Sequence, residues 1–570
     1  MRVIERGEVD ELVGRVADGA AGVGEGFGGS GSHADSRFDT HGGSHSDTYA
    51  DSHSESHSDS HSASDSDSGA EDFGPGISAE RLALLLDIMA EVELLPTEHP
   101  DAVAVRRATA GVYKSVKVRR RAERQARVME ADRAVTAKTA TGAPSRLDDE
   151  TQGLPLSSET AESGNAVAGV LKRERSCYIC KVRYREVHAF YHNLCPDCAA
   201  ENWKRRDART DLSGKRALLT GGRAKIGMYI ALRLLRDGAH LTITTRFPND
   251  AARRFAAMPD SGEWLHRLRV VGIDLRDVAQ VVALADTVAA EGPLDIMVNN
   301  AAQTVRRSAG AYEPLIRAEF EALPDGPLPE LISFGRFTGS GLVALPGQTR
   351  SSEAIAADLV GVRASGVAAV GDVAGADLVS LALTAGSATL DRITAGTAID
   401  AGGLVPDLAD TNSWVQTVED VDPIELLEVQ LCNSTAPFVL ISRLRSAMKA
   451  SSSPRKHIVN VSAMEGVFSR GYKGAGHPHT NMAKAALNML TRTSAREMFQ
   501  TDSILMNSVD TGWITDERPH PDRVRLADEG FHAPLDLVDG AARVYDPIVR
   551  GEQGEDLYGC FLKDYANAGW

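Results

Sequence analysis

The stretch Thr220-Gly221-Gly222-Arg223-Ala224-Lys225-Ile226-Gly227 decides the fold of this chain. The run at 216–220, which is expected to be a strand, ends directly before Gly221. An amphipathic segment follows at about 225–237, so a tight turn between a strand and a helix is expected. In such a turn, backbone N–H groups and a helix N-terminus face a pyrophosphate, and glycine allows close approach because it lacks a Cβ atom. The stretch therefore predicts a dinucleotide-binding unit.

Strands and helices alternate on the C-terminal side of this turn. Strands are expected at 216–220, 240–245, 268–272, 294–298, 457–461, 504–509 and 557–562. Helices are expected between them at about 225–237, 277–290, 422–449, 481–499 and 535–550. This alternation is typical of the α/β class with a doubly wound parallel sheet, the Rossmann arrangement.

Composition divides the chain into five parts. The expected parts are a disordered Ser/His/Asp tail at 1–77, a helical segment at 78–140, a linker at 141–172, a four-cysteine module at 173–205 and the Rossmann domain at 211–565. Residues 28–76 of this tail are of low complexity and have almost no apolar side chains to bury, so an expanded solvated chain is favoured over weak metal scavenging by its histidines. In the helical segment, Ser78 is expected to cap a helix at 79–95, and a second helix is expected at about 101–138.

Residues 303–420 interrupt the alternation after the fourth strand. Their part from 338 to 405 is rich in Gly, Ala, Ser and Val and has weak periodicity. A structureless loop of this length is unusual inside a compact domain. We interpret the segment as an insertion that covers an active site or offers an interaction surface.

The chain has 570 residues, a formal net charge of -17 and a pI near 5.5. This acidity disfavours a nucleic-acid-binding role, and we interpret the basic run Lys117–Arg124 as a solvated helix face. No apolar run approaches the roughly 20 residues of a membrane span, and the first residues lack a signal pattern. We expect no membrane partner and a cytoplasmic location.

Four of the six cysteines follow the spacing C-x2-C-x14-C-x2-C: Cys177, Cys180, Cys195 and Cys198. In a reducing compartment this spacing predicts one Zn2+ bound by four thiolates. Since four sulfurs leave no open position on the metal, the module is expected to brace a neighbouring domain or dock a protein. The alternatives are a redox-active cysteine pair, or His188 or His192 in place of one cysteine.

Further motifs follow the turn in an order that makes residues from about 212 to 565 resemble the short-chain dehydrogenase/reductase family. They are Asp274-Leu275, Asn299-Asn300-Ala301-Ala302, Asn433-Ser434-Thr435-Ala436-Pro437-Phe438, Asn460-Val461-Ser462-Ala463, Lys484 and Asp510-Thr511-Gly512-Trp513. The resemblance implies an NAD(P)-dependent oxidoreductase that transfers hydride to or from a carbonyl or alcohol substrate. This chain departs from the family pattern at two positions: Lys225 replaces a glycine, and Thr511 replaces a proline.

The resemblance assigns roles to individual residues. It implies that Asp274 and Leu275 flank the adenine, Asn300 supports the ribose side, Lys484 binds the nicotinamide ribose and Gly512 opens the loop beside the nicotinamide. In the phosphate turn, the expected cofactor-binding residues are Thr220, Gly221, Arg223, Ile226 and Gly227. The family's assembly through two long helices implies a homo-oligomer formed by helices 422–449 and 481–499.

The residues at the end of the second strand bear on the choice of cofactor. An NAD site would place an acid there to bind the ribose 2′-hydroxyl, but the strand ends in Thr245-Arg246-Phe247. Arg246 and Arg223 both suit a 2′-phosphate, which favours guanidinium donors. We therefore expect NADP rather than NAD.

The reaction centre lacks the residue that carries the proton in this family. Asn433 and Lys484 match the family's catalytic asparagine and lysine, but Thr480 occupies the tyrosine position. An aliphatic hydroxyl titrates far above the pKa of about 10 of a phenol, so an altered proton-transfer site is expected. Ala463 occupies the serine position, and Ser462, one residue earlier, is expected to point away from the site.

Several groups remain open as the proton carrier: Lys484 or a water chain beside Thr480, His477, His479, and Tyr472. The alternative function is a catalytically inactive, NADP-binding scaffold or redox sensor. In that protein the zinc module and the insertion would bind a partner.

Overall fold

The structure is a computed structural model, and it describes residues 76–144, 146, 167–334, 375–383, 388, 390–471, 473–515 and 517–570. The chain forms two units, Met1–Met129 and Glu130–Trp570. The expected tail, most of the expected linker, the middle of the insertion and Tyr472 lie outside the described residues.

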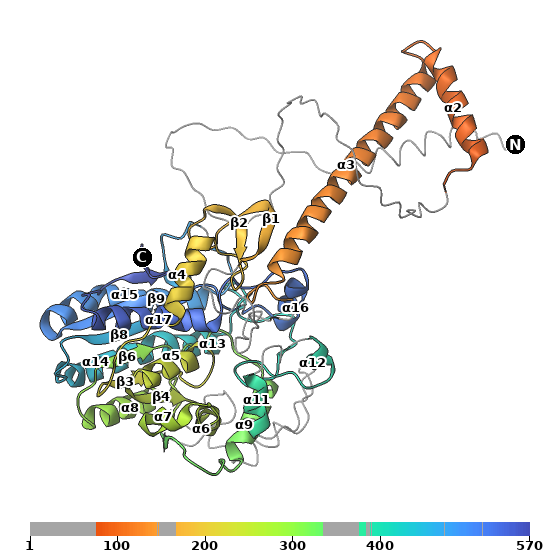
Figure 1. The fold of residues 1–570 in the computed structure, drawn as a ribbon. Helices are drawn as coiled ribbons and strands as arrows, with labels where there is room; N and C mark the ends of the chain where they lie inside the picture. The colour runs from red at the N-terminus through yellow and green to blue at the C-terminus, as the bar shows by residue number, and fades with distance from the viewer. Residues whose placement is uncertain are drawn as a thin grey trace. The chain divides into compact units, whose positions relative to one another are not determined.

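A nine-stranded sheet forms the centre of the second unit (Figure 1). Its order is β11-β10-β9-β8-β6-β3-β4-β5-β7, and every neighbouring pair is parallel except β10 and β11. The strands are β3 (Arg216–Leu219), β4 (His240–Thr245), β5 (Leu268–Gly272), β6 (Ile296–Asn299), β7 (Glu330–Ser333), β8 (Lys456–Ser462), β9 (Ile504–Asp510), β10 (Phe561–Lys563) and β11 (Ala566–Ala568). The doubly wound parallel sheet predicted from the sequence is confirmed.

Helices cover both faces of the sheet, because alternate side chains of each buried strand point to opposite faces. One face packs against α5 (Lys225–Arg236) and α17 (Leu537–Glu552), and in β6 the side chains of Ile296 and Val298 point this way. The other face receives Met297 and packs against three helices. They are α8 (Val278–Ala290), α14 (Ala436–Lys449) and α15 (Pro478–Asp502).

The helix expected at 422–449 is interrupted. It consists of α13 (Pro423–Gln430) and α14, joined by a π-helical turn, Leu431–Thr435. Pro437 has no N–H for the carbonyl of Asn433, so the regular ladder cannot continue through this point. The combined stretch Pro423–Lys449 is the one helix among the described residues that is long and apolar enough to cross a membrane, and 44% of its most apolar window is buried inside the protein.

The described parts of the segment expected as an insertion are folded. They contain the 3-10 turn Ala309–Tyr312, α9 (Glu313–Phe320), β7, α11 (Gly375–Ala382) and α12 (Leu390–Thr394). β7 pairs with β5 and extends the sheet by one strand. Leu315, Leu378, Ile399 and Val405 form a separate apolar cluster with Phe247, so the insertion has its own small core.

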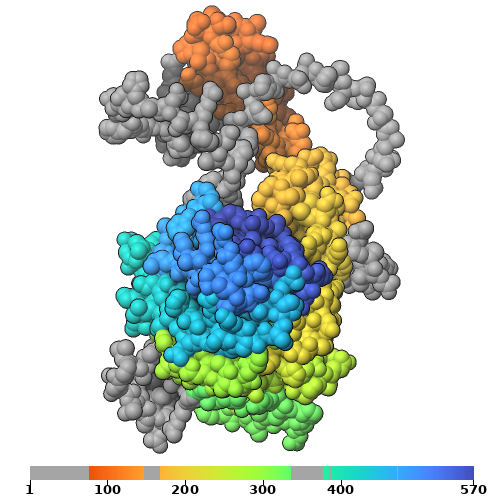
Figure 2. Space-filling view, turned by 90° about the vertical axis from the view of Figure 1, so that its left-hand side faces the viewer, coloured from red at the N-terminus to blue at the C-terminus, as the bar shows by residue number. Residues whose placement is uncertain are grey.

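The cysteine module is built from β1 (Val167–Ser176), β2 (Arg183–His188) and α4 (Pro196–Arg206). β1 begins inside the stretch expected as linker, and buried Arg146 donates hydrogen bonds to the carbonyls of Ala533 and Leu535, both 2.6 Å long. In Figure 2 the yellow surface of the module lies directly against the blue C-terminal surface. The module and the sheet domain therefore pack together as one body.

The contact between α4 and the start of α17 is ionic and buried. Arg206 bonds Asp536 at 2.6 Å and Asp539 at 3.0 Å, and both carboxylates are almost fully buried. Tyr191 donates a hydrogen bond of 2.6 Å to Asp539 as well. One guanidinium thus compensates two buried carboxylates at the junction.

Shorter helices complete the second unit. They are α6 (Pro248–Ala256), α7 (Ser261–Trp264), α16 (His520–Asp528) and the 3-10 turns Leu265–Arg267 and Met464–Gly466. In the first unit, α2 (Ala79–Glu93) and the greater part of α3 (Pro100–Thr136) match the two expected helices. Ser78 precedes α2, but its side chain makes no capping hydrogen bond.

Replacing Arg206 by methionine tests the ionic junction. Because two buried carboxylates would lose their cation, we expect the free energy of unfolding to fall by about 3–5 kcal/mol, measured by urea denaturation. The neighbouring exposed Lys204 provides the control, and Lys204→Met is expected to change stability little. Equal stability of the two variants would contradict a stabilising junction.

Candidate functional site

The phosphate turn is bound to the end of β6. The side-chain amide of Asn300 donates to the carbonyl oxygens of Thr220 and Gly221, at 3.1 and 3.0 Å. The Thr220 hydroxyl oxygen accepts from the backbone N–H groups of Asn300 and Ala301, both at 3.0 Å. The structure thus brings these predicted residues together, and the side chain of Asn300 serves to hold the turn.

At two positions of the turn only glycine fits, because a Cβ atom would clash with neighbouring backbone atoms. Gly221 has φ 69°, and a Cβ atom on it would lie 2.9 Å from the Cα atom of Ala301. A Cβ atom on Gly227 would lie 1.9 Å from the carbonyl oxygen of Gly221. Lys225, at the position where a glycine is expected, also has a positive φ of 52°, so this departure from the pattern keeps the glycine-like backbone.

The insertion reaches the phosphate turn. A Cβ atom on Gly402 would lie 3.6 Å from Cε of Lys225, and Ala401 packs against the cluster that contains Ile514 and Ile226. Arg254 of α6 donates to the Ala401 carbonyl at 3.1 Å. Residues 401 and 402 of the insertion therefore lie beside the turn.

The two arginines expected at a 2′-phosphate have different surroundings. Arg223 pairs with buried Asp250 at 2.5 Å, and Asp250 also bonds Arg254 at 2.7 Å. Arg246 lies over the rings of Phe247 and Tyr312, 5.6 and 5.2 Å from their centroids. Among the described residues no carboxylate forms an ion pair with Arg246, so of the two arginines it is the one whose charge is less compensated.

Asp274, which is expected to flank the adenine, also takes part in ion pairing. The Asp274 carboxylate accepts from Nε of Arg276 at 2.9 and 3.1 Å, and Arg276 donates to Glu428 at 2.8 Å. Burial acts to raise the pKa of Asp274, but the bonds and charge of Arg276 outweigh it and the net pKa is lowered. Leu275 is 8% exposed and belongs to the apolar core on this face.

Lys484 lies near the start of α15, with its amino group buried. Its Nζ donates to the carbonyl of Val461 at 2.8 Å. Desolvation lowers the pKa of Lys484 to about 8, while the nearby Cys432, Glu465 and Asp510 act in the opposite direction. The lysine is therefore a group that titrates near neutral pH.

Asn433 lies in the π-helical turn and is buried. Its side-chain amide donates to the carbonyl of Gln303 at 2.9 Å, and its side-chain oxygen accepts from the N–H of the same residue at 2.7 Å. Both polar ends of the side chain thus hold the chain where the insertion begins.

Thr480 is buried, and its hydroxyl donates to the carbonyl of His477 at 2.9 Å within the first turn of α15. Ser462 donates to the side-chain oxygen of Asn488 at 2.6 Å, and this buried contact agrees with the expectation that Ser462 points away from the site. Neither hydroxyl is free to donate a proton without breaking a bond.

The two histidines before Thr480 differ. The ring of His477 stacks on Trp414 with centroids 3.9 Å apart, and its Nδ1 lies 2.9 Å from the Trp414 carbonyl. His479 is 1% exposed, and within the described part of the chain its ring nitrogens have no hydrogen-bond partner. Burial lowers the pKa of both histidines, so both are neutral at pH 7.

Two features of the site were not predicted. Burial raises the pKa of Asp510 to about 6, and its carboxylate accepts from the N–H of Gly512 at 2.9 Å. Tyr178 of the cysteine module accepts a hydrogen bond of 2.9 Å from the N–H of Trp513, next to that glycine. Asp510 lay in a recognised motif, but nothing in the sequence connected Tyr178 with a loop 335 positions away.

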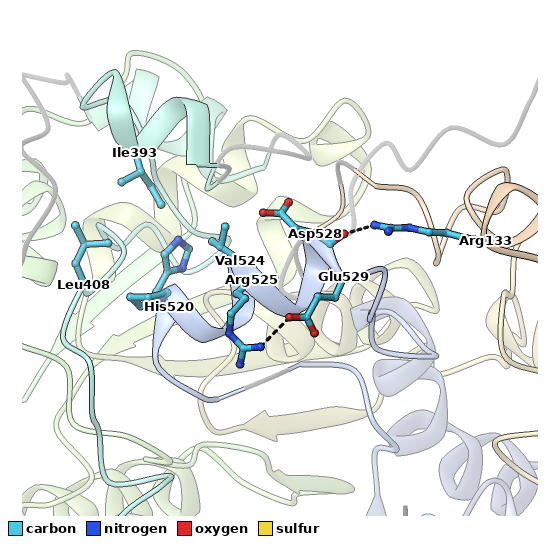
Figure 3. Close-up of a pocket in the computed structure, with 9 residues that line it drawn as sticks. Arg133, Ile393, Leu408, His520, Val524, Arg525, Asp528 and Glu529 are labelled. Carbon is cyan, nitrogen blue, oxygen red and sulfur yellow. Dashed lines mark hydrogen bonds and ion pairs between the residues drawn. The ribbon is translucent and has the colours of Figure 1, made fainter. Parts of the chain in front are cut away.

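A separate cleft of about 540 Å³ lies beside α16 (Figure 3). Its lining residues are Arg133, Ile393, Leu408, His520, Pro521, Val524, Arg525, Asp528 and Glu529. Arg525 pairs with Glu529 at 2.9 Å across one turn of the helix. None of the predicted catalytic or cofactor-binding residues lines this cleft.

The four predicted metal ligands lie together. The sulfur atoms of Cys177, Cys180, Cys195 and Cys198 are all within 4.8 Å of one another. The Sγ atoms of Cys180 and Cys195 are 3.6 Å apart, near the ~3.8 Å that tetrahedral Zn–S bonds of about 2.3 Å require. The donor set and its spacing thus fit a structural zinc ion.

The two histidines of the module are engaged elsewhere. Nδ1 of His188 accepts from the N–H of Phe190 at 3.0 Å, and Nδ1 of His192 lies 2.8 Å from the Thr141 hydroxyl. Neither belongs to the cysteine cluster. The four-sulfur arrangement is therefore favoured over one with a histidine ligand.

Comparison with known proteins identifies the region around the phosphate turn. The family model for short chain dehydrogenase matches residues 215–322. The uncharacterized protein R665 of Acanthamoeba polyphaga mimivirus is 28% identical over 386 residues, which are 66% of this chain and 71% of that protein. A probable oxidoreductase of Streptomyces lividans is 40% identical over 91 residues, and this chain covers 29% of its length.

Solved structures of dehydrogenases are similar as well. A short chain dehydrogenase from Burkholderia cenocepacia in complex with NADP is 20% identical, with a TM-score of 0.36, over 62% of this chain and 97% of the other. An NADPH-bound carbonyl reductase from chicken fatty liver is 15% identical, with a TM-score of 0.36, over 63% and 100%.

Elemental analysis of the purified protein tests the metal site. We expect one zinc ion per chain, lost in Cys177→Ser and in Cys195→Ser because three thiolates leave the tetrahedron incomplete. Cys560→Ser is the matched control and should keep the metal, since Cys560 lies outside the cluster. A zinc-free wild-type protein after purification without chelators would contradict the assignment.

Proposed function

We propose that this chain, which belongs to the short-chain dehydrogenase/reductase family, is an oxidoreductase that binds NADP. It transfers hydride to or from a carbonyl or alcohol substrate, and its proton-transfer site is altered. The observation that carries the proposal is the phosphate turn with Arg246 beside it, a cation without a carboxylate ion-pair partner in the described part of the chain, and Lys484 bonded to the Val461 carbonyl near the end of β8.

The backbone of the turn and the N-terminus of α5 would hold the pyrophosphate, since the two glycines leave the N–H groups uncovered. Arg246 would bind the 2′-phosphate with its planar guanidinium. Arg223 contributes less than the sequence suggested, because Asp250 already compensates its charge. The preference for NADP over NAD therefore depends mainly on Arg246.

The bound cofactor supplies the hydride. In the reducing direction, Lys484 would donate a proton from Nζ to the substrate oxygen and regain one from solvent. A pKa of about 8 suits this role, because the ammonium is populated at neutral pH and is still a usable acid. Thr480 cannot replace the phenol of the family, but its oxygen can accept a hydrogen bond while its proton stays on the His477 carbonyl.

A second candidate is a catalytically inactive NADP-binding scaffold. The supporting observation is that Thr480 and Asn433 both use their polar groups in internal hydrogen bonds. In this case the zinc module and the insertion would present a surface to a partner protein. The two candidates share the cofactor site and differ only in turnover.

Isothermal titration with NADPH and NADH tests the cofactor site. We expect wild-type protein to bind NADPH more tightly, and Arg246→Gln to weaken NADPH binding about 10- to 100-fold because a charge-assisted contact is lost. NADH binding should change little. Arg443→Gln is the control, because Arg443 pairs with Asp286 in an exposed contact between α14 and α8. Equal affinity for both dinucleotides in wild-type protein would remove the role of Arg246.

Turnover of a panel of carbonyl compounds with NADPH tests the proton donor. We expect Lys484→Met to abolish turnover and Thr480→Val to retain it. The rate should be constant below pH 8 and fall about tenfold per pH unit above it, as the ammonium is lost. Lys473→Met is the control, since Lys473 bonds only the carbonyls of Met464 and Glu465.

The opposite pattern would identify the scaffold. Binding of NADPH without turnover of any carbonyl compound, combined with turnover in Thr480→Tyr, would mean that the site keeps reductase geometry and lacks only the acid. Retained turnover in Lys484→Met would exclude the lysine as the proton donor.

A further inference from the structure

The first unit presents an apolar helix that nothing in its described part covers. α2 has no buried residue, although its sequence AERLALLLDIMAEVE is mostly apolar. Leu84, Leu85 and Leu86 are 60%, 47% and 58% exposed. An apolar helix face is normally buried, and a helix this short is marginal by itself in water. α2 therefore requires a covering element.

α3 does not cover it within the chain. The two helices diverge from the turn that joins them, and they are not packed side by side (Figure 1). In the part of α3 that belongs to the first unit, Ala102 is the buried apolar residue, whereas Val112 and Val118 are more than 60% exposed. Two uncovered helices thus lie in one hairpin.

α3 carries a face that complements α2 in shape. Five small or β-branched residues recur at spacings of three and four positions and therefore share one side of the helix: Ala108, Gly111, Ser115, Val118 and Ala122. A Cβ atom on Gly111 would meet nothing within 4 Å, so this side is open. Small side chains on one helix leave room for the leucines of another.

The two helices also complement each other in charge. α2 has four acidic residues and one basic residue, whereas α3 from Pro100 to Met129 has nine basic residues and two acidic residues. Arg107, Lys114 and Arg121 recur every seven residues along the edge of the small-residue face. Charges in such flanking positions select the partner in helix pairing.

We propose that this hairpin pairs with the hairpin of a second copy of the chain, with α2 of each copy lying on α3 of the other. A twofold arrangement makes the same contact twice, so each acidic helix meets a basic one. The lengths permit this, since α2, about 22 Å long, fits within the about 31 Å that α3 spans from residue 109 to 129. The result is a four-helix bundle, a standard way to bury two helical hairpins.

A charge exchange in the full chain tests this pairing. One variant carries Asp87→Lys and Glu91→Lys on α2, and the other carries Lys114→Glu and Arg121→Glu on α3. In the proposed arrangement each variant alone brings like charges together at both contacts. Coexpression of the two restores opposite charges at both contacts. Arg443→Glu, in the second unit, is the matched control.

Hydrogen–deuterium exchange of the α2 amides is the readout, because it reports on this helix whatever other contacts the copies make. We expect wild-type protein and the control to show at least tenfold slower exchange than either variant alone, with protection that increases with protein concentration. Protection should return in the coexpressed pair. Leu85→Ser with Leu86→Ser should also remove it.

Several results would overturn the proposal. Unprotected α2 amides in wild-type protein would mean that no pairing occurs. Protection that is independent of concentration and is not restored by coexpression would assign the cover to the same chain. Protection that appears only when a polyanion or another protein is added would assign it to a different partner.

Discussion

The hydrogen bonds from the Asn300 amide to the carbonyls of Thr220 and Gly221 hold the nucleotide-binding end of the sheet together. They join the ends of two neighbouring parallel strands, β3 and β6, at the point where the backbone of the turn must stay uncovered. The contact leaves no space for side chains, as the 1.9 Å distance for a Cβ atom on Gly227 indicates. The close approach of two backbones therefore fixes the site before any cofactor-binding side chain is considered.

Buried guanidinium groups perform the second structural task, which is to attach the added parts of this chain to the sheet domain. Arg206 joins the cysteine module to α17, and Arg254, which pairs with Asp250 inside α6, joins α6 to the insertion through the Ala401 carbonyl. Burying such charges is expensive unless each is paired. Asp250 also pairs with Arg223 of the phosphate turn, so the carboxylate that fixes Arg254 also compensates the charge of Arg223.

Much of the fold could be predicted because parallel strands that are buried on both faces leave continuous apolar runs in the sequence. β8 and β9 are buried throughout and were placed within one residue at each end. The last strand, expected at 557–562, is shorter because its pairing with β9 starts only at Phe561. β7 was missed, since the edge strand ELIS is short and mostly exposed and so has no burial pattern.

The parts of the candidate site that could be predicted are those whose functional residues are close to one another in the sequence. The four cysteines satisfy a spacing rule that survives folding, and the glycine turn is one continuous segment. The pairs Arg223–Asp250 and Tyr178–Trp513 could not be predicted, because each joins elements whose meeting depends on the complete topology. The pKa shifts could not be predicted either, because they depend on burial. Burial lowers the pKa of Lys484 to about 8 and raises the pKa of Asp510 to about 6.

The loss of the tyrosine and the presence of the insertion are connected through the start of α15. Trp414 of the insertion stacks on His477 and accepts from its ring, which fixes that residue in a left-handed conformation with φ 44°. The His477 carbonyl then accepts the Thr480 hydroxyl. A phenol at position 480 could not make this short bond within the helical turn, because its hydroxyl lies at the far end of the ring. Threonine therefore suits a helix start held by the insertion, and in the proposed reaction the proton would come from Lys484, whose pKa burial lowers.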